Sequence, residues 1–181
     1  ILGINGNLAP VVDVNNNANN PVIGLRSYGD DAVMVGELAA ASIAGMAEYN
    51  VIGTAKHFPG HGDTAVDSHL GIPMVDKTEE ELEKIELIPF RAAVNAGIPA
   101  MMISHMMFPK IEEDRVPCTM SRKFVTGLLK EKLGYQGLIF TDCMEMLAIQ
   151  EHFGTPEGTV ASFKAGVDMG EVSSSMHLLW G

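Results

Sequence analysis

Short apolar runs alternate with helical periodicities along this chain. The runs predict buried strands at residues 8–14, 51–57, 100–104, 138–141 and 166–169. Between them, apolar residues recur at the spacing of one helix face. Strands of this length that alternate with helices are typical of βα units, so the pattern predicts a parallel sheet.

Cap and turn residues bound the first and third of the longer predicted helices. Asp30 is the expected N-cap of a helix that runs to about Met46. Ser121 is expected to cap a helix that ends at Leu133, where Gly134 follows. These short polar residues accept hydrogen bonds from the free backbone N–H groups of a first turn.

Two further helices are bounded in the same way. Thr78 and Glu81 have the spacing of a capping box, for a helix that continues through Phe90 and that Pro89 is expected to kink. Thr155 is the expected cap of the last helix, with a proline directly after it.

A polar residue stands at or just past the carboxyl end of four predicted strands. These residues are Asp13, Lys56, His57, His105 and Asp142. Active sites of (β/α)₈ barrels lie at this end of the strands. A complete barrel takes roughly 250 residues, so five predicted strands in 181 residues indicate an α/β fold of the (β/α)₈ TIM-barrel type that is truncated. An open doubly wound sheet is the alternative.

Composition narrows the possible partners. The chain is 46% hydrophobic and 19% charged with a formal net charge of −11, which is typical of a globular protein and disfavours nucleic acid as a partner. No apolar run approaches the roughly 20 residues that span a membrane, and no signal-peptide pattern opens the chain. Cys118 and Cys143 are expected to be free thiols. The compartment stays unspecified.

The segment 55–69 combines three histidines, two aspartates and a lysine with two glycines. Burying unpaired groups of this kind is expensive, so the segment indicates a site for a polar ligand. Zinc uses such residue types, but the HxxxHxD spacing from His57 matches no familiar metal motif. Phosphate-loop patterns of glycine are absent from the sequence as well. We therefore expect neither a metal nor another cofactor.

Asp142 ends the dry strand over 138–141. A carboxylate at this position can attack an electrophilic carbon. The alternative is a structural N-cap of a helix that starts near Met144, because aspartate is a favoured cap.

The triplet Asp67-Ser68-His69 places a carboxylate two residues from an imidazole. Such a pair can set the histidine tautomer and produce a general acid or base near neutral pH. A solvated surface loop is the alternative.

Three cationic or neutral donors complete the candidate site. Lys56 and His57 can donate to ligand hydroxyls, although Lys56 could also pair with Asp13. Arg26 lies in a glycine-rich loop and can act as a bidentate clamp or be a solvated side chain. His105, among methionines, is expected to be a buried and hydrogen-bonded residue instead of a ligand.

Several of these motifs together resemble glycoside hydrolase family 3, in its β-N-acetylglucosaminidase (β-N-acetylhexosaminidase) branch. The resemblance rests on residues 8–14, on 20–28, on Lys56-His57-Phe58-Pro59-Gly60-His61-Gly62 followed by Asp67-Ser68-His69, and on Thr141-Asp142, which fall in the expected order. It covers the chain to about Met169. It implies one partial catalytic barrel domain over residues 1–181, with about strands 3 to 7 of the barrel present.

The resemblance also implies roles for individual residues. Asp142 corresponds to the catalytic nucleophile of a retaining mechanism, and His69 to the acid/base with Asp67 as its partner. Arg26, Lys56 and His57 correspond to residues that bind the hydroxyl and acetamido groups of the sugar. The implied substrate is a small carbohydrate with terminal β-linked N-acetylglucosamine, from bacterial muropeptides or chitin-type oligosaccharides.

Other functions stay open at this point. A β-glucosidase or an N-acetylglucosaminide phosphorylase belongs to the same class of reaction. A non-catalytic sugar-binding fragment and a metal-dependent hydrolase belong to other classes. Because the first barrel strands are missing from the chain, barrel closure is expected to need the full-length chain or a partner, and an open sheet edge otherwise invites pairing.

Overall fold

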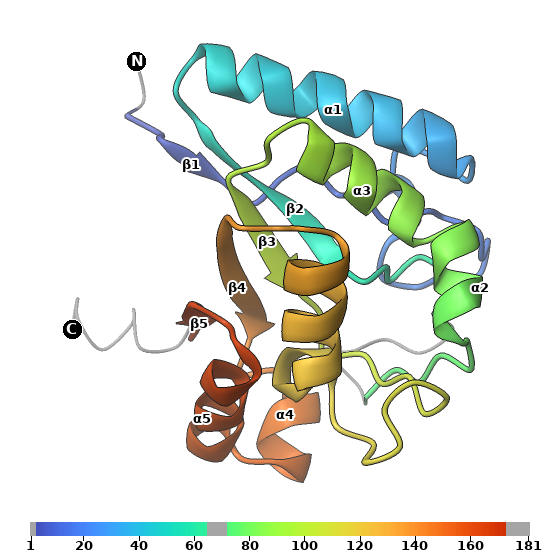
Figure 1. Ribbon diagram of the computed structural model, residues 1–181, viewed down its shortest axis with the longest axis vertical. Coiled ribbons are helices and arrows are strands. Elements are labelled where there is room, and N and C mark those ends of the chain that lie inside the picture. The colour runs from blue at the N-terminus through green and yellow to red at the C-terminus, as the bar shows by residue number, and fades with distance from the viewer. Residues whose placement is uncertain (1–2, 65–71, 173–181) are drawn as a thin grey trace.

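A computed structural model describes residues 3–64 and 72–172 of the chain, apart from the side chain of Ala148 (Figure 1). Its centre is a parallel sheet whose strands follow sequence order: β1 (Gly6–Asn7), β2 (Ile52–Phe58), β3 (Ala100–Ile103), β4 (Leu138–Cys143) and β5 (Met169–Glu171). A doubly wound sheet would reverse this order at a switch point. The curled sheet with sequential strands confirms the predicted truncated (β/α)₈ barrel.

Helices connect the strands and cover the sheet. The helical elements are η1 (Gly24–Arg26), α1 (Ala32–Glu48), α2 (Glu79–Lys84), α3 (Leu87–Asn95), η2 (Cys118–Met120), the π-helix η3 (Lys123–Lys132), α4 (Leu147–His152) and α5 (Thr155–Ala165). α1 and α3 pack side by side and both contact β2, while α5 contacts β5 (Figure 1). No helix within the described ranges has the length and apolar character needed to cross a bilayer.

The core lies between the sheet and these helices. Phe58 at the end of β2 meets Phe90 of α3 edge to face, with ring centroids 5.3 Å apart. Met101 of β3 and Ile139 of β4 are fully buried in the same apolar cluster. Burying one such side chain contributes about 1.5–3 kcal/mol, so this cluster fixes the strands whose ends carry the polar residues.

The prediction of a strand over 8–14 is wrong, since this segment holds only an isolated bridge at residue 11. The segment runs beside β2, because the N–H of Val12 donates to the carbonyl of Lys56 and the carbonyl of Pro10 accepts from the N–H of Lys56. Pro10 itself has no N–H to offer, which interrupts a ladder. The regular strand is therefore confined to Gly6–Asn7, and residue 11 forms an isolated bridge.

Three of the predicted helix N-caps are wrong. One cap lies one residue further along the chain, and the other two side chains bind tertiary partners. The N-cap of α1 is Asp31, not Asp30, and its carboxylate accepts from two backbone N–H groups of the first turn. Ser121 donates to the carboxylate of Glu112 instead of capping η3. Thr155 donates to a main-chain carbonyl, and Gly154 is the N-cap of α5. Short polar side chains take tertiary partners where these are within reach.

The helix predicted from Thr78 through Phe90 is two helices. The capping box of Thr78 and Glu81 is confirmed. The break falls at residues 85–86, between α2 and α3, and not at Pro89. Pro89 lies in the first turn of α3, where its missing N–H has no helical partner to lose.

The last strand also begins later than predicted. Gly166 has φ +113° and ends α5 in a left-handed conformation, which favours glycine. The regular strand β5 starts at Met169 and reaches Glu171. This shift brings a carboxylate to the carboxyl edge of the sheet.

Candidate active site

A cavity of about 210 Å³ opens at the carboxyl ends of the strands. Its walls combine apolar and ionisable side chains. They are Leu8, Val22, Arg26, Lys56, His57, His61, Met102, Asp142, Met146 and Glu171. Four of the predicted site residues, Arg26, Lys56, His57 and Asp142, thus come together around one cavity.

Register shifts in the sheet orient the polar side chains. Lys56 and His57 are consecutive in β2, yet both border the cavity. The pairing of β2 with β3 shifts at this pair, between Ala55 and Phe58. Successive side chains of a regular strand point to opposite faces, and an irregularity of this kind redirects one of them. The Lys56–His57 peptide bond is also cis.

Asp142 lies in β4, at a second register shift. One of its carboxylate oxygens accepts from the N–H of Cys143 at 2.8 Å, and the next helix begins only at Leu147. The N-cap of that helix is Met146. Asp142 is therefore not a helix cap, and its carboxylate borders the cavity.

Asp13 holds two histidines of the site in place, although it does not itself border the cavity. Its fully buried carboxylate accepts from Nδ1 of His57 at 2.7 Å and from the backbone N–H of His61 at 2.6 Å. Burial alone would raise the pKa of Asp13, but the two histidines and their hydrogen bonds outweigh it, and the pKa is lowered. The pairing of Asp13 with Lys56 that the sequence allowed is replaced by this pairing with His57.

Arg26 reaches the cavity from η1. Its guanidinium donates to the carbonyl of Val22 at 3.3 Å and lies 3.4 Å from Nε2 of His57. Burial and the Arg26 charge lower the pKa of Lys56, against the attraction of carboxylates that include Asp142. Among the described residues, two cationic side chains with hydrogen-bond donors to spare therefore share this cavity with a carboxylate.

Glu171 at the end of β5 adds a second carboxyl group to the cavity. Its backbone N–H donates to Oγ1 of Thr141, which holds this residue next to the segment that carries Asp142. Burial raises the pKa of Glu171, the Asp142 charge adds to this, and Lys56 opposes it.

His105 binds the backbone next to Asp142. Its Nε2 donates to the carbonyl of Cys143 at 3.0 Å, since a carbonyl can only accept, and Nδ1 then accepts from the hydroxyl of Thr119 at 3.0 Å. Burial lowers the pKa of His105. The prediction of a buried and satisfied histidine is confirmed, and the ring holds the backbone directly after Asp142.

The loop that carries His61 packs very closely against the segment that contains Val14. A Cβ on Gly62 would stand 1.6 Å from the carbonyl oxygen of Val14, so only glycine fits there. Gly60 has φ +128°, a conformation that side chains rarely adopt. The two glycines let the chain turn back after β2 and bring His61 to the cavity wall.

The predicted acid/base pair, Asp67 and His69, lies outside the described residues. Within residues 3–64 and 72–172, no group of three or more His, Cys, Asp or Glu side chains could hold a metal ion.

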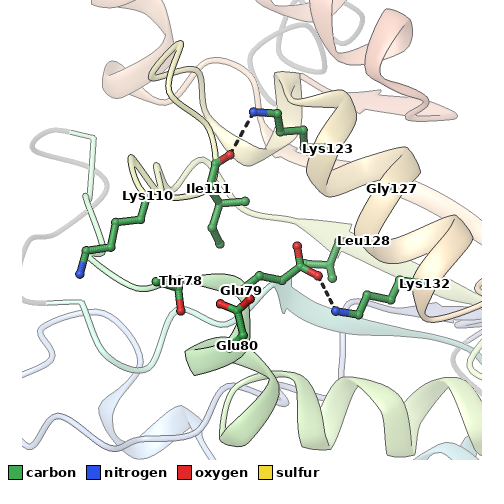
Figure 2. A pocket seen from close by; sticks show the side chains of 9 residues that line it. All are labelled: Thr78, Glu79, Glu80, Lys110, Ile111, Lys123, Gly127, Leu128 and Lys132. Carbon is green, nitrogen blue, oxygen red and sulfur yellow. Dashed lines mark hydrogen bonds and ion pairs between the residues drawn. The ribbon is translucent and has the colours of Figure 1, made fainter.

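A larger pocket of about 560 Å³ lies elsewhere, between the start of α2, the loop at Lys110 and the face of η3 (Figure 2). Its lysines are all engaged. Lys132 pairs with Glu79 and Glu83, and Lys123 pairs with Glu112 at 3.3 Å. Lys110 pairs with an aspartate at 3.0 Å. In this outer pocket, each lysine is therefore already paired with a carboxylate, and none is left to bind a ligand beside a nucleophile.

Three contributions to the site go beyond the predictions made from the sequence. The sequence places Asp13 at the end of a strand and as a possible partner of Lys56, places His61 among possible metal ligands and in the family motif, and gives Glu171 no role. The signals for Asp13 are its position at the end of a predicted strand and its charge within the apolar run of residues 11–14. Nothing local marks Glu171, because its role depends on pairing between β4 and β5.

Comparison with known proteins identifies relatives of the whole chain. The family model described as glycosyl hydrolase family 3 N terminal domain matches residues 1–177. Beta-hexosaminidase A of Pseudoalteromonas piscicida is 41% identical over 179 residues, which are 93% of this chain and 30% of that protein. A beta-hexosaminidase of Tolumonas auensis is 38% identical over 162 residues, 89% of this chain and 47% of that protein.

A solved structure agrees with these relatives. The glycoside hydrolase family 3 beta-N-acetylglucosaminidase from Paenibacillus sp. str. FPU-7 superimposes with a TM-score of 0.92 at 47% identity, over 94% of this chain and 32% of that one. The chain thus spans less than half the length of these relatives. With the matched residues covering nearly all of its sequence, it belongs to glycosyl hydrolase family 3, within the N-terminal domain of that family.

Proposed function

We propose that this chain carries the catalytic residues of a retaining β-N-acetylglucosaminidase that releases terminal β-linked N-acetylglucosamine from muropeptides or chitin-type oligosaccharides. The observation that carries the proposal is a strand-end cavity that Asp142, Arg26, Lys56 and His57 all border. The beta-hexosaminidase names of the relatives support the same substrate class.

Asp142 is the proposed nucleophile. Its carboxylate attacks the anomeric carbon, the bond from that carbon to the leaving oxygen breaks, and a covalent glycosyl-enzyme forms. The placement of Asp142 in β4, free of a capping role, supports this assignment. His105, through the Cys143 carbonyl, keeps the adjacent backbone in place.

His69, with Asp67 as its partner, is the proposed acid/base. The imidazolium protonates the departing oxygen in the first step, and the neutral imidazole then takes a proton from the water that hydrolyses the glycosyl-enzyme. Retaining glycosidases usually divide this work between two carboxyl groups. A neutral imidazole does not repel Asp142 as a second carboxylate would.

Arg26, Lys56 and His57 are the proposed sugar-binding residues. A sugar with an acetamido group offers hydroxyls and one carbonyl, and the charged N–H groups of Arg26 and Lys56 can donate to both. Asp13 fixes the tautomer of His57 by accepting from Nδ1–H, so Nε2 is an acceptor that Arg26 or a sugar hydroxyl can donate to.

The first test is hydrolysis of an aryl N-acetyl-β-glucosaminide by the natural full-length protein. We expect turnover by the wild type, and a fluorinated N-acetylglucosaminyl donor should leave a glycosyl ester on Asp142 that mass spectrometry of peptides can locate. Trapping on another carboxylate would remove Asp142 from the nucleophile role.

The acid/base assignment has its own test. The His69→Ala variant should lose most activity on substrates with poor leaving groups and retain much of it on activated aryl substrates. Equal losses on both would contradict the role of His69.

Alternative functions are separated by products. A phosphorylase would form sugar phosphate only when inorganic phosphate is present, whereas a hydrolase forms free sugar without it. A β-glucosidase would prefer the substrate without the acetamido group. Calorimetric binding of N-acetylglucosamine without any turnover would indicate a non-catalytic sugar-binding protein.

A further inference from the structure

We infer that His61 is a further substrate-binding residue whose Nε2 forms a hydrogen bond with one hydroxyl group of the sugar. The inference rests on the proposed function and adds a specific contact to it. It concerns a side chain that no role in the proposed reaction uses.

The first observation is a buried, unpartnered polar atom in a residue that borders the cavity. His61 borders the cavity together with Asp142 and Lys56, and only 3% of the residue is exposed. Its Nε2 has no hydrogen-bond partner among the residues that the structure describes. Buried polar atoms in folded proteins almost always have a partner, so this atom is a candidate for a ligand contact.

The second observation is that the ring is held on its other side. Nδ1 of His61 lies 2.7 Å from Oγ1 of Thr64, and Nδ2 of Asn20 donates to the same oxygen at 3.2 Å. Asn20 also donates to the carbonyls of His61 and Gly62, at 2.8 and 2.9 Å. These bonds orient the imidazole before any ligand arrives.

The backbone of His61 is fixed as well. Its N–H donates to the buried carboxylate of Asp13, which also binds His57. The His57 and His61 rings meet edge to face with centroids 6.0 Å apart. One buried aspartate therefore positions two imidazoles on the same wall, and preorganised groups of this kind bind at low entropic cost.

The chemistry of the ring selects the ligand group. Burial lowers the pKa of His61, against the attraction of Asp13. A neutral imidazole has one donor and one acceptor nitrogen, and a hydroxyl can complement Nε2 in either tautomer. An anionic group would not be favoured, so a sugar hydroxyl is the fitting partner.

Two substitutions separate substrate binding from a purely structural role. An asparagine amide occupies roughly the place of Nδ1, so His61→Asn keeps the bond to Thr64 and loses the polar atom at the place of Nε2. A glutamine amide reaches the place of Nε2, so His61→Gln keeps that polar atom and loses the bond to Thr64. A structural role predicts that the asparagine variant is the better one, whereas substrate binding predicts the glutamine variant.

The experiment measures kcat/KM of the natural full-length protein and both variants on an aryl N-acetyl-β-glucosaminide and on its monodeoxy analogues. We expect H61N to lose about 10- to 100-fold on the parent substrate, with KM raised and the thermal midpoint nearly unchanged. H61Q should stay within about fivefold of the wild type. The loss in H61N should vanish on the one analogue that lacks the partner hydroxyl.

Full activity of H61N, or an equal loss on all analogues, would overturn the inference while leaving the proposed function intact. Absence of turnover and of sugar binding by the wild type would overturn the proposed function and this inference with it. If H61N does not fold, Thr64→Val gives a second comparison, because it removes the hydroxyl that orients the ring and so lets Nε2 move away from its partner. Its loss should vanish on one monodeoxy analogue, and a uniform loss on all analogues would overturn the inference.

Discussion

The strand-end cavity and the outer pocket differ in whether their cationic side chains form ion pairs. The outer pocket is more than twice as large, about 560 Å³ against about 210 Å³. Its lysines are engaged in ion pairs with nearby carboxylates. In the cavity, Lys56 and Arg26 form no ion pair with a described residue although Asp142 borders the same cavity. Cationic side chains without an ion pair among the described residues, and not a larger volume, therefore distinguish the candidate active site from the outer pocket.

The fold explains this difference. The outer pocket lies between helices and a loop, where long side chains extend toward solvent and can adjust to form ion pairs (Figure 2). The cavity lies where rigid strands end, and its groups are held by buried residues such as Asp13 and His105. Surface ion pairs between flexible side chains contribute only about 0–1 kcal/mol, whereas the strand-end groups depend on one another.

The largest contrast is expected for the carboxylates of the two regions. Asp142→Ala should lower kcat on an aryl N-acetyl-β-glucosaminide by more than about a thousandfold, because no nucleophile remains. Glu79→Ala in the outer pocket should leave kcat within about twofold. Steady-state kinetics of both variants, with circular dichroism to verify folding, tests the contrast. Comparable losses in the two variants would contradict it.

Asp13 should matter for both stability and activity. Asp13→Asn leaves His57 and the backbone of His61 without their charged acceptor, and breaking a buried pair typically costs about 3–5 kcal/mol. Misplacement of the two rings should also reduce kcat/KM by about a hundredfold. Urea denaturation and kinetics measure the two effects.

Glu112→Gln is the matched control for Asp13, since Glu112 is another buried carboxylate that accepts from Ser121 near the outer pocket. It should lower the free energy of unfolding without a selective loss of kcat/KM. A control variant that loses as much activity as Asp13→Asn would show that stability, not positioning, is measured.

The pH dependence of stability should reflect the buried histidines. Burial lowers the pKa of His105 below the ordinary value of 6.5, so its contribution is complete above pH 6.5. Below that pH the unfolded state binds the proton first, and the free energy of unfolding decreases until the lowered pKa is passed. His105→Gln, which can still donate to the Cys143 carbonyl, should flatten this decrease between pH 7 and 5.

Thermal midpoints of the wild type and His105→Gln across this range provide the measurement. Some acid sensitivity should remain in the variant, because the pKa of His61 is also lowered by burial. An unchanged slope in His105→Gln would mean that His105 does not contribute to it.

The smallest effect is expected for Lys132→Ala. Lys132 pairs with Glu79 and Glu83 and is partly exposed, so its loss should change the free energy of unfolding by no more than about 1 kcal/mol. Addition of salt should weaken the pair in the wild type and reduce even this difference. A large loss of activity in Lys132→Ala would end the distinction between the two regions.

Local pattern alone predicted which segments form strands and helices and at which edge of the sheet the site lies. Apolar runs and helical spacing predicted the parallel strands, and the polar residues after them predicted that one edge of the sheet carries Lys56, His57 and Asp142. Such patterns are local because the period of side chains in a strand or helix depends only on backbone geometry. The capping box of Thr78 and Glu81 was equally readable, since its two hydrogen bonds join neighbouring residues.

Only the tertiary structure decided which groups meet. Asp13 pairs with His57 and not with Lys56, Ser121 turns to Glu112, and Glu171 reaches the cavity through pairing of β4 with β5. The register shift at Lys56 and His57, which brings both to one cavity, likewise depends on the neighbouring strand. These outcomes result from contacts between residues far apart in the chain, where competing partners differ by small free energies that no local pattern records.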